Sequence, residues 1–520
     1  MPDFKPSPQQ QSFFQWVEKA RGNTILEAVA GSGKTTTIIK AIPLMQVHPV
    51  NSDWTRSIIV LAFNKKMADE LREKVSGFDR VIAGTFHSQG LYLLREAFGK
   101  DLEINQYKCA DIFDQKAIEA GWLEGVIAIK DVILSMVSMA KNRAFSEDAT
   151  LEDWEEIVYQ FDLDSGLDTE KYSIIDVIPY AQEILSLSNE NTKIIDYDDM
   201  IYMPVLFNVH VKYPKDWVLI DEAQDTNPAR RRLAEMLLKP KYGRLVAVGD
   251  PHQAIFGFTG ADNDSLEQIA SKFNCTRMPL SVSYRCPKAV IAVAQTVVSH
   301  IQAHDDAPVG VVTEVAYDEI MPMLDDRSKD SETAIICRYN RPLVTLCFQL
   351  IRKGIPAKIE GRDIGQGLIK LARRWKIKNL IALEDKLISY RDREVTKAME
   401  KKDGAKADRI EDQVETLLVL IERARELSKS TIDELAVIIE DMFADDTKGK
   451  DLITLSSVHK SKGLEWDRVF ILGRREIMPS PRAEQQWQYE QEINLIYVAV
   501  TRAKQQLIDV DMPPKEKRKC

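Results

Sequence analysis

A glycine-rich segment near the N-terminus, Ala28-Val-Ala-Gly-Ser-Gly-Lys-Thr35, has the composition of a phosphate-binding turn. It follows the β-branched run 24–30 and precedes the helix-like run TTTIIKAI. Such a turn closes backbone N–H groups around phosphate oxygens, and the helix start adds partial positive charge. Lys34 would neutralise the outer phosphates of a nucleotide, and the Thr35 hydroxyl would bind Mg²⁺. The residues assigned to nucleotide binding are Ala30, Gly31, Ser32, Gly33, Lys34, Thr35 and Thr36.

A carboxylate pair forms the second candidate site. The apolar run Val218-Leu-Ile ends in Asp221-Glu222. Asp221 would hold Mg²⁺ through its water shell, and Glu222 would orient or deprotonate an attacking water. An acidic strand end alone also fits a solvated turn, but its combination with the glycine-rich turn favours phosphoanhydride hydrolysis.

Parallel strands would position both sites, because buried V/I/L-rich runs alternate with helical stretches. The first set of expected strands comprises 24–30, 57–63, 81–86, 216–223 and 244–250. The second set comprises 333–338, 451–459, 468–473 and 506–511. Stretches without strand character, about 91–193 and 366–449, are expected to be charged, amphipathic helices. The sequence therefore predicts an α/β fold with two parallel-sheet domains, each interrupted by a helical insert.

Composition narrows the class of protein. The 520 residues correspond to roughly three to four domains at about 150 residues each. Six cysteines form no CxxC pair, which argues against a disulfide framework or a zinc ribbon. No apolar run approaches the ~18 residues of a membrane span, and the N-terminus does not resemble a signal peptide. We expect a soluble, cytoplasmic protein with no membrane partner.

The net charge of −10 leaves the partner open, because nucleic-acid binding depends on where the positive charge lies.

Further motifs accompany the two sites. In chain order they are Pro8-Gln9-Gln10, 61–71 (LAFNKKMADEL), 84–90 (GTFHSQG), 246–261 (VAVGDPHQAIFGFTGA), 280–287 (LSVSYRCP), 453–471 (ITLSSVHKSKGLEWDRVFI) and 491–504 (QEINLIYVAVTRAK). Over nearly its whole length, the chain resembles the superfamily 1 DNA helicases of the UvrD/Rep/PcrA-like branch. The resemblance implies two RecA-like P-loop domains, 1–90 with 196–279 and 280–365 with 450–520, carrying helical inserts at 91–195 and 366–449.

This resemblance implies ATP as the nucleotide, with Mg²⁺. Gln10 would read the adenine edge, Tyr284 would stack on the adenine, and Glu465 would hold the ribose. Gln253 would sense the γ-phosphate.

Two arginines complete the implied catalytic set. Arg285 and Arg502, far in sequence from Lys34, would stabilise the charge that develops on the γ-phosphate from across a cleft. Closure around ATP and release after hydrolysis would then drive movement. For an isolated arginine, an ordinary surface ion pair is the alternative. The family motifs in which these two arginines stand, SYR and TRAK, disfavour that alternative.

The resemblance also implies contacts with unstacked bases. Phe63, Phe256 and Phe258 fall where the family places aromatic rings, and each base stack contributes about 1–3 kcal/mol. Composition alone would place these rings in the core, so both interpretations stay open. The other implied DNA-contacting positions are Asn64, Thr85, His87 and His459.

Some positions depart from the family pattern. Phe256…Phe258-Thr259 stands where the family usually has Tyr…Trp-Arg, Thr36 replaces an Arg that lies on the adenine, and Asn494 often corresponds to Arg. His300 and His304 have helical spacing without a third metal ligand, so a solvated helix end is favoured.

The second insert is about half the usual length. Its basic residues around Trp375 fit either a duplex contact or a solvated helix with Trp375 packed inward. These residues are Lys370, Arg373, Arg374, Lys376 and Lys378. Arg230-Arg-Arg232 is expected to be a solvated helix face.

We therefore expect an ATP-dependent single-stranded DNA translocase and helicase, 3′ to 5′ by resemblance, acting on single-stranded and on forked or tailed duplex DNA. The alternative is a DNA-stimulated ATPase that displaces or remodels DNA-bound proteins with little unwinding, which the short second insert favours. A small-molecule kinase would not need the second α/β domain.

Overall fold

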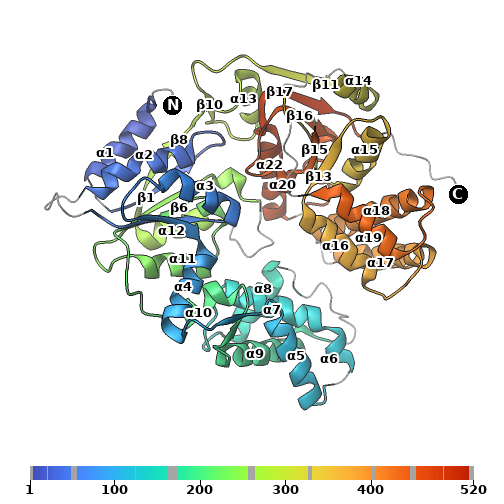
Figure 1. The fold of residues 1–520 in the computed structure, drawn as a ribbon, viewed down its shortest axis with the longest axis horizontal. Coiled ribbons are helices and arrows are strands. Elements are labelled where there is room, and N and C mark those ends of the chain that lie inside the picture. Colours follow the sequence, from blue (N-terminus) through green and yellow to red (C-terminus); the bar gives the residue numbers. More distant parts are fainter. Residues whose placement is uncertain are drawn as a thin grey trace. The chain divides into compact units, whose positions relative to one another are not determined.

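The chain forms two compact units in the computed structural model (Figure 1). The first unit comprises Met1–Ala28 and Gly33–Leu280, and the second comprises Val29–Ser32 and Ser281–Cys520. The structure describes residues 4–19, 22–47, 55–122, 124–161, 163, 172–255, 264–325, 331–400, 404–444, 452–483 and 485–513. Within these ranges no helix is both long and apolar enough to cross a membrane.

The first unit contains a six-stranded parallel sheet in the order β3-β2-β6-β7-β1-β8. Its strands are β1 (Asn23–Ala28), β2 (Ile58–Ala62), β3 (Val81–Thr85), β6 (Trp217–Ile220), β7 (Arg244–Gly249) and β8 (Cys275–Leu280). The five strands expected from the apolar runs are all present. Strand β8 was missed, because its sequence CTRMPL includes exposed positions and lacks a continuous apolar run.

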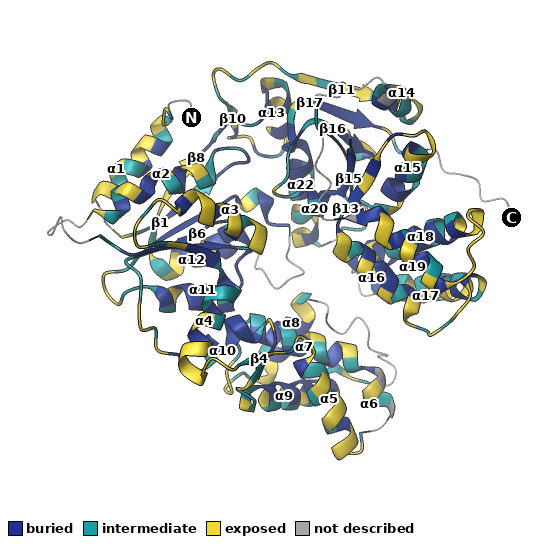
Figure 2. Ribbon diagram, viewed as in Figure 1, coloured by how far each residue is buried: buried dark blue, intermediate teal, exposed yellow. Residues whose placement is uncertain are grey.

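Helices cover both faces of this sheet, so β2 and β6 are buried throughout (Figure 2). Alternate residues face opposite sides. Leu26 and Val60 pack with Phe13 and Ile38 on one face, whereas Ile59 packs with helices on the other face. The helices are α1 (Pro8–Lys19), α2 (Lys34–Gln46), α3 (Lys65–Val75), α4 (Phe86–Phe98), α10 (Asp199–Leu206), α11 (Pro228–Leu237) and α12 (Ser265–Phe273).

The first insert is mainly helical and has its own apolar core. Its helices are α5 (Lys108–Glu119), α6 (Glu124–Ala128), α7 (Lys130–Asn142), α8 (Leu151–Phe161) and α9 (Ile174–Glu190). The expectation of no strand between 91 and 193 is wrong at β4 (Glu103–Ile104), which pairs with β5 (Ile194–Ile195). This pairing joins segments far apart in sequence, so no local pattern indicates it.

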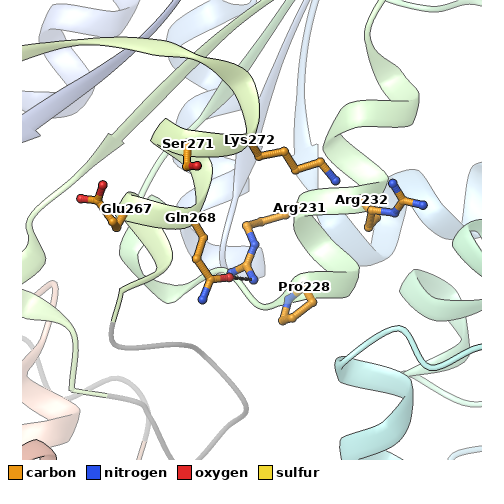
Figure 3. A pocket seen from close by; sticks show the side chains of 7 residues that line it. All are labelled: Pro228, Arg231, Arg232, Glu267, Gln268, Ser271 and Lys272. Atoms are coloured by element: carbon orange, nitrogen blue, oxygen red, sulfur yellow. Dashed lines mark hydrogen bonds between the residues drawn. The ribbon is translucent and has the colours of Figure 1, made fainter. Parts of the chain in front are cut away.

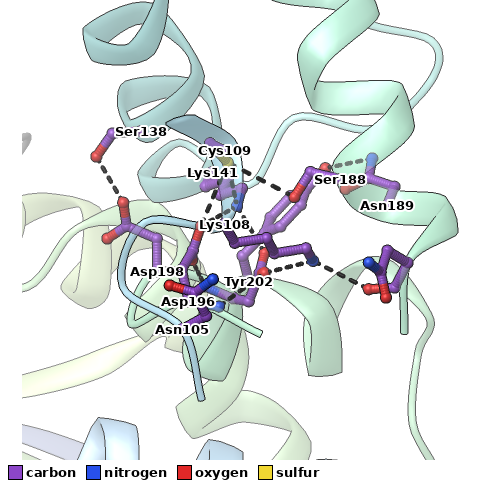
Figure 4. Close-up of polar contacts among 12 residues, drawn as sticks. Asn105, Lys108, Cys109, Ser138, Lys141, Ser188, Asn189, Asp196, Asp198 and Tyr202 are labelled. Carbon is purple, nitrogen blue, oxygen red and sulfur yellow. Dashed lines mark hydrogen bonds and ion pairs between the residues drawn. The ribbon is translucent and has the colours of Figure 1, made fainter. Parts of the chain in front are cut away.

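A buried cluster of charges ties this insert together (Figure 4). Lys141 Nζ lies 2.6 Å from Asp196 Oδ2 and 2.8 Å from Asp199 Oδ1, and Lys108 Nζ lies 2.7 Å from Asp199 Oδ2. Burial alone would lower the pKa of Lys141, but Asp199 and Asp196 raise it. Burial raises the pKa of the neighbouring Cys109 thiol to about 11. These ion pairs fix α5 and α7 to the turn through which the chain enters α10.

The second unit contains a seven-stranded parallel sheet in the order β11-β17-β16-β12-β15-β13-β14. Its strands are β11 (Val311–Val315), β12 (Thr333–Cys337), β13 (Ala357–Glu360), β14 (Phe443–Ala444), β15 (Ile453–Ser457), β16 (Trp466–Leu472) and β17 (Ala503–Val510). A separate pair joins β9 (Val282–Ser283) to β10 (Gln302–Ala303). The sequence missed β11 and β13, which are short and partly exposed.

The helices of this unit include the second insert. They are α13 (Lys288–Ala294), α14 (Ile320–Asp325), α15 (Asn340–Arg352), α16 (Arg362–Arg373), α17 (Leu380–Glu400), α18 (Gly404–Glu426), α19 (Ile432–Met442), α20 (Val458–Ser461), α21 (Arg474–Ile477) and α22 (Gln486–Val500). The expectation of helix throughout 366–449 is wrong at β14. Trp375 packs inward against the core of this unit, and the centroid of its ring lies 5.5 Å from that of Tyr390. Of the two alternatives for this segment, the structure agrees with the helix in which Trp375 packs inward.

Carboxylates on α18 attach the second insert to the sheet. Asp412 accepts hydrogen bonds from the backbone N–H groups of Asn340 and Arg341 at 2.9 and 3.0 Å, which satisfies the start of α15. Asp408 accepts a hydrogen bond from the Tyr339 hydroxyl at 3.0 Å. The two-sheet arrangement with helical inserts thus agrees with the expected fold class, whereas the detailed domain boundaries stay predictions.

The buried cluster of the first insert generates a stability prediction. Lys141→Met leaves Asp196 and Asp199 buried without their shared cation, so we expect a loss of about 3–5 kcal/mol. The matched control is Lys130→Met, because the Lys130–Asp114 pair is more exposed and contributes less than about 1 kcal/mol. Urea unfolding monitored by circular dichroism measures both. Equal, small effects would contradict the assigned role of the cluster.

Candidate nucleotide and nucleic-acid sites

The glycine-rich turn connects β1 to α2. Gly31 and Gly33 have φ angles of 72° and 78°, in the left-handed region that favours glycine. Helix α2 begins at Lys34, directly after the turn, so its free N–H groups face the position expected for phosphates. The buried Ser32 hydroxyl has no hydrogen-bond partner among the described residues. A phosphate oxygen would suit both features.

The turn and the carboxylate pair lie together. Lys34 Nζ is 3.1 Å from Glu222 Oε1, and the Thr35 hydroxyl donates to Asp221 Oδ2 at 3.0 Å. Parallel pairing explains this, because β1 and β6 both pair with β7 and end at the same edge of the sheet. Glu222 adopts a left-handed backbone with φ of 54° as the chain leaves β6.

Burial and neighbouring charges shift the pKa values of the groups in this cluster. Burial and the nearby Glu222 raise the pKa of Asp221 to about 6. Burial would lower the pKa of Lys34, but Glu222, Asp250 and Asp221 raise it above its ordinary value. Three carboxylates are therefore close enough to act on the charge of one ammonium group, and Glu222 contacts it directly. Such an excess of oxygen donors and negative charge fits a hard divalent cation such as Mg²⁺.

Hydrogen bonds connect Gln253 to Glu222. Gln253 Nε2 donates to Asp250 Oδ2 at 2.7 Å, and the Asp250 N–H donates to Gln224 Oε1 at 3.1 Å. Gln224 Nε2 in turn donates to Glu222 Oε2 at 2.6 Å. Gln224 and Asp250 were not among the site residues expected from the sequence. Their positions directly after β6 and β7 were the available signal.

Gln10 lies against the first turn of α2. Its Nε2 donates to the Thr37 hydroxyl at 2.8 Å, and its Oε1 accepts from the Ser7 N–H at 2.9 Å. Thr36 is exposed. Both residues thus lie next to the glycine-rich turn.

The first unit brings together several of the residues expected to contact DNA. Phe63 and Asn64 follow β2, and Thr85 and His87 mark the end of the adjacent β3. Asn64 accepts from the Met67 N–H at 2.9 Å and Thr85 from the Ser88 N–H at 3.1 Å, so both residues cap helices. Phe256, Phe258 and Thr259 lie outside the described residues.

Arg230 joins this group. Its guanidinium lies 4.5 Å from the centroid of the Phe63 ring. Burial and Arg230 lower the pKa of His87 to about 4, so this imidazole is neutral at pH 7. The expected solvated face at 230–232 is wrong for Arg230 and for the buried Arg231, because both turn toward the body of the unit.

In the second unit, Arg285 and Arg502 are close enough to affect each other. Arg285 Nε lies 2.5 Å from Glu465 Oε2. Arg502 is fully buried and donates to the carbonyls of Val498 and Leu464 at 2.8 and 3.0 Å. Burial and the Arg285 charge lower the pKa of Arg502 to about 10. Glu465 is therefore an ion-pair partner of Arg285 here.

The residues Val29–Ser32 belong to this unit. The Tyr284 N–H donates to the Gly31 carbonyl, and the Ala30 N–H donates to the Tyr497 hydroxyl, both at 2.8 Å. A Cβ on residue 31 would lie 2.5 Å from Arg285 Cβ, so only glycine fits.

The remaining predicted residues of this unit lie on separate elements. The exposed Tyr284 ring lies 4.9 Å from that of His304. His459 lies on α20, where burial and Arg338 lower the pKa of its imidazole to about 3. Among the described residues, His300 and His304 do not belong to any group of three or more His, Cys, Asp or Glu side chains that could hold a metal ion.

A surface pocket of about 410 Å³ lies between α11 and α12 (Figure 3). Its charged side chains are satisfied by neighbours, since Arg232 and Lys272 pair with Glu235. It contains no residue of the nucleotide cluster and defines no site.

Two parallel sheets, with a glycine-rich turn beside a strand-end carboxylate pair, define a P-loop nucleoside triphosphatase. The family model described as "UvrD/REP helicase N-terminal domain" matches residues 8–274, and the "UvrD-like helicase C-terminal domain" matches residues 377–509. The chain belongs to the UvrD/Rep helicase family, with two RecA-like domains, and is an ATP-hydrolysing DNA helicase.

Several similar proteins match more than nine-tenths of this chain. The ATP-dependent DNA helicase Rep of Buchnera aphidicola is 23% identical, across 94% of this chain and 93% of its own. The ATP-dependent DNA helicase PcrA of Bacillus subtilis is 24% identical, across 94% and 81%. The ATP-dependent DNA helicase UvrD2 of Mycobacterium tuberculosis is 23% identical, across 93% and 76%.

The proximity of Arg230 to His87 predicts a measurable change in the pKa of His87 when Arg230 is replaced. Arg230→Gln removes one of the two causes that lower the pKa of His87, so that pKa rises from about 4 toward 6.5 while burial keeps it below that value. Selective histidine labelling and NMR titration measure the shift. Arg232→Gln, on the exposed side of α11, leaves His87 unchanged, and equal shifts in both variants would refute the assigned contact.

Proposed function

We propose that this helicase moves 3′ to 5′ along single-stranded DNA and separates forked or tailed duplexes, using ATP with Mg²⁺. The observation that carries the use of ATP with Mg²⁺ is the cluster in which Lys34 contacts Glu222 and Thr35 contacts Asp221, whereas the direction rests on the resemblance to the UvrD/Rep/PcrA-like branch. This cluster supplies a phosphate-binding cation, two candidate Mg²⁺ ligands and a candidate general base in one place.

Each residue of the cluster has a distinct proposed task. Thr35 and Asp221 hold Mg²⁺, which would neutralise the charge of the triphosphate when bound. Lys34 exchanges its contact with Glu222 for the outer phosphates. Glu222 is then available to orient and deprotonate the attacking water. The Gln224 side chain holds the Glu222 carboxylate in place, because Gln224 Nε2 donates to Glu222 Oε2 at 2.6 Å.

The hydrogen-bonded chain from Gln253 supports a sensing role. Because Gln253 reaches Glu222 through Asp250 and Gln224, a contact between Gln253 and the γ-phosphate would also change the restraint on the general base. Gln253 therefore couples phosphate occupancy to the orientation of Glu222.

Arg285 and Arg502 are proposed to stabilise the γ-phosphate during hydrolysis. Among the described residues, Arg502 donates hydrogen bonds to uncharged oxygens and to no carboxylate, so no anion neutralises its charge by direct contact. The ion pair with Glu465 would have to open for Arg285 to contact phosphate and for Glu465 to hold the ribose. Gln10 and Tyr284 would contact the adenine.

DNA contact is proposed for the strand-end residues of the first unit, Phe63, Asn64, Thr85 and His87, together with Phe256, Phe258 and His459. A half-buried ring and a neutral imidazole suit stacking and hydrogen bonding with bases rather than charge neutralisation. Sequence-tolerant stacking is what a motor that moves along any strand requires.

The first test concerns Lys34. Lys34→Ala removes the cation that would bind the outer phosphates, so ATP hydrolysis with single-stranded DNA should fall at least about 100-fold. DNA binding should persist, because Lys34 is not among the strand-end residues. A coupled phosphate assay and fluorescence anisotropy measure the two activities. Lys40→Ala, at an exposed position of the same helix, is the control, and retained turnover in Lys34→Ala would refute the assignment.

The second test concerns direction and strand separation. With ATP and Mg²⁺, the protein should displace the strand of a 3′-tailed duplex and leave 5′-tailed and blunt duplexes intact. Displacement from the 5′-tailed substrate alone would overturn the direction. Movement without displacement, detected by streptavidin release from end-biotinylated DNA, would favour the alternative of an ATPase that clears proteins from DNA.

A further inference from the structure

Arg230 has an unusual environment for a charged residue next to a candidate DNA-binding ring. It stands in the first turn of α11, where its backbone N–H donates to the side chain of Asn227 at 2.9 Å. Its guanidinium lies 4.5 Å from the Phe63 centroid, and Nη1 donates to the Asp225 carbonyl at 3.1 Å. The buried Nε has no hydrogen-bond partner among the described residues.

The base of α11 is held from the first insert. Asn227 Nδ2 donates to Asn142 Oδ1 at 2.6 Å, and Asn142 Nδ2 donates to Asp198 Oδ1 at 3.2 Å. Asp198 also accepts from the Ser138 hydroxyl at 2.5 Å. The start of α11, and with it the Cα of Arg230, is therefore fixed by a chain of side-chain hydrogen bonds. Arg230 can restrain a neighbour because its own backbone is restrained.

Burial of the Arg230 guanidinium costs free energy of desolvation, yet the side chain remains charged. Burial lowers the pKa of Arg230, yet a guanidinium keeps its proton in a protein. Among the described residues no carboxylate forms an ion pair with it. The nearest compensation comes from the Phe63 ring face, the Asp225 carbonyl and the field of Asp225 and Asp198. A buried cation on an aromatic face has a clear mechanical consequence, because it removes rotational freedom from the ring.

We propose that Arg230 is a positioning residue for single-stranded DNA, whose guanidinium holds the Phe63 ring in the orientation in which it receives a base. The inference rests on the proposed function, since it takes single-stranded DNA as the ligand of Phe63. An ordered ring loses no rotamer freedom when the base arrives, so binding is tighter than with a freely rotating ring. Arg230 contributes through Phe63 and does not itself contact phosphate.

Anisotropy titrations with a fluorescent oligothymidylate, repeated at several salt concentrations, test this role. Arg230→Gln should weaken binding about five- to tenfold, as expected for one newly mobile side chain and a lost cation–π contact. The slope of log affinity against log salt should not change, because no phosphate contact is lost. Arg230→Lys, which keeps the charge but not the planar stack, should restore only part of the affinity. Arg232→Gln should bind like the wild type.

A double-mutant cycle separates positioning from general damage. In a Phe63→Ala background, Arg230→Gln should have no further effect on affinity, because the ring that it orients is absent. In ATPase assays, Arg230→Gln should raise the DNA concentration needed for half-maximal stimulation and retain the rate at saturating DNA. Unfolding of α11 would instead lower that plateau and reduce helical circular dichroism.

Three results would overturn the inference. They are unchanged binding by Arg230→Gln, additive losses in the double mutant, and a salt slope smaller by about one, which would indicate a direct phosphate contact. Wild-type protein that binds no oligothymidylate would overturn the proposed function, and this inference with it. Wild-type binding with an unaffected Arg230→Gln variant would overturn the inference alone.

Discussion

Buried negative charge beside the glycine-rich turn is the constraint on which the candidate nucleotide site depends. Asp221, Glu222 and Asp250 share the environment of a single ammonium group, and burial raises the pKa of Asp221 to about 6. A fold selected only for stability would avoid such a cluster, because each desolvated carboxylate costs free energy. A bound cation and phosphates would offset this cost, as expected for a ligand-binding site rather than for a purely structural cluster.

The parallel sheet makes this cluster possible. The carboxyl ends of β1, β2, β3, β6 and β7 lie at one edge, and the chain leaves that edge by turns and helix starts that expose side chains and N–H groups. The nucleotide residues follow β1, β6 and β7, whereas the strand-end aromatic and imidazole groups follow β2 and β3. Because these strands are neighbours, both groups of residues lie along the same edge of one sheet.

The helical inserts are joined to the sheets by buried polar groups. Lys108, Lys141, Asp196 and Asp199 fix the first insert, and Asp408 and Asp412 fix α18 of the second insert to the start of α15. Apolar packing tolerates sliding, but an ion pair or a helix cap has one geometry. The chain of hydrogen bonds from Asp198 through Asn142 to Asn227 extends this fixed geometry as far as the helix that carries Arg230.

The amino-acid sequence by itself determined the class of the fold, nine of the strands and the positions of the glycine-rich turn and the acidic pair. Continuous apolar runs and glycines with positive φ are local features, so a local pattern suffices to predict them. Only the tertiary structure decided that Lys34 contacts Glu222, that Gln224 and Asp250 link Gln253 to Glu222, and that the Arg230 guanidinium lies over the Phe63 ring. It also revealed β8, β11 and β13, whose partly exposed sequences become strands because neighbouring strands supply their hydrogen bonds. Such contacts join residues far apart in the chain, and their free energy depends on burial, which is a property of the folded molecule and not of any segment within it.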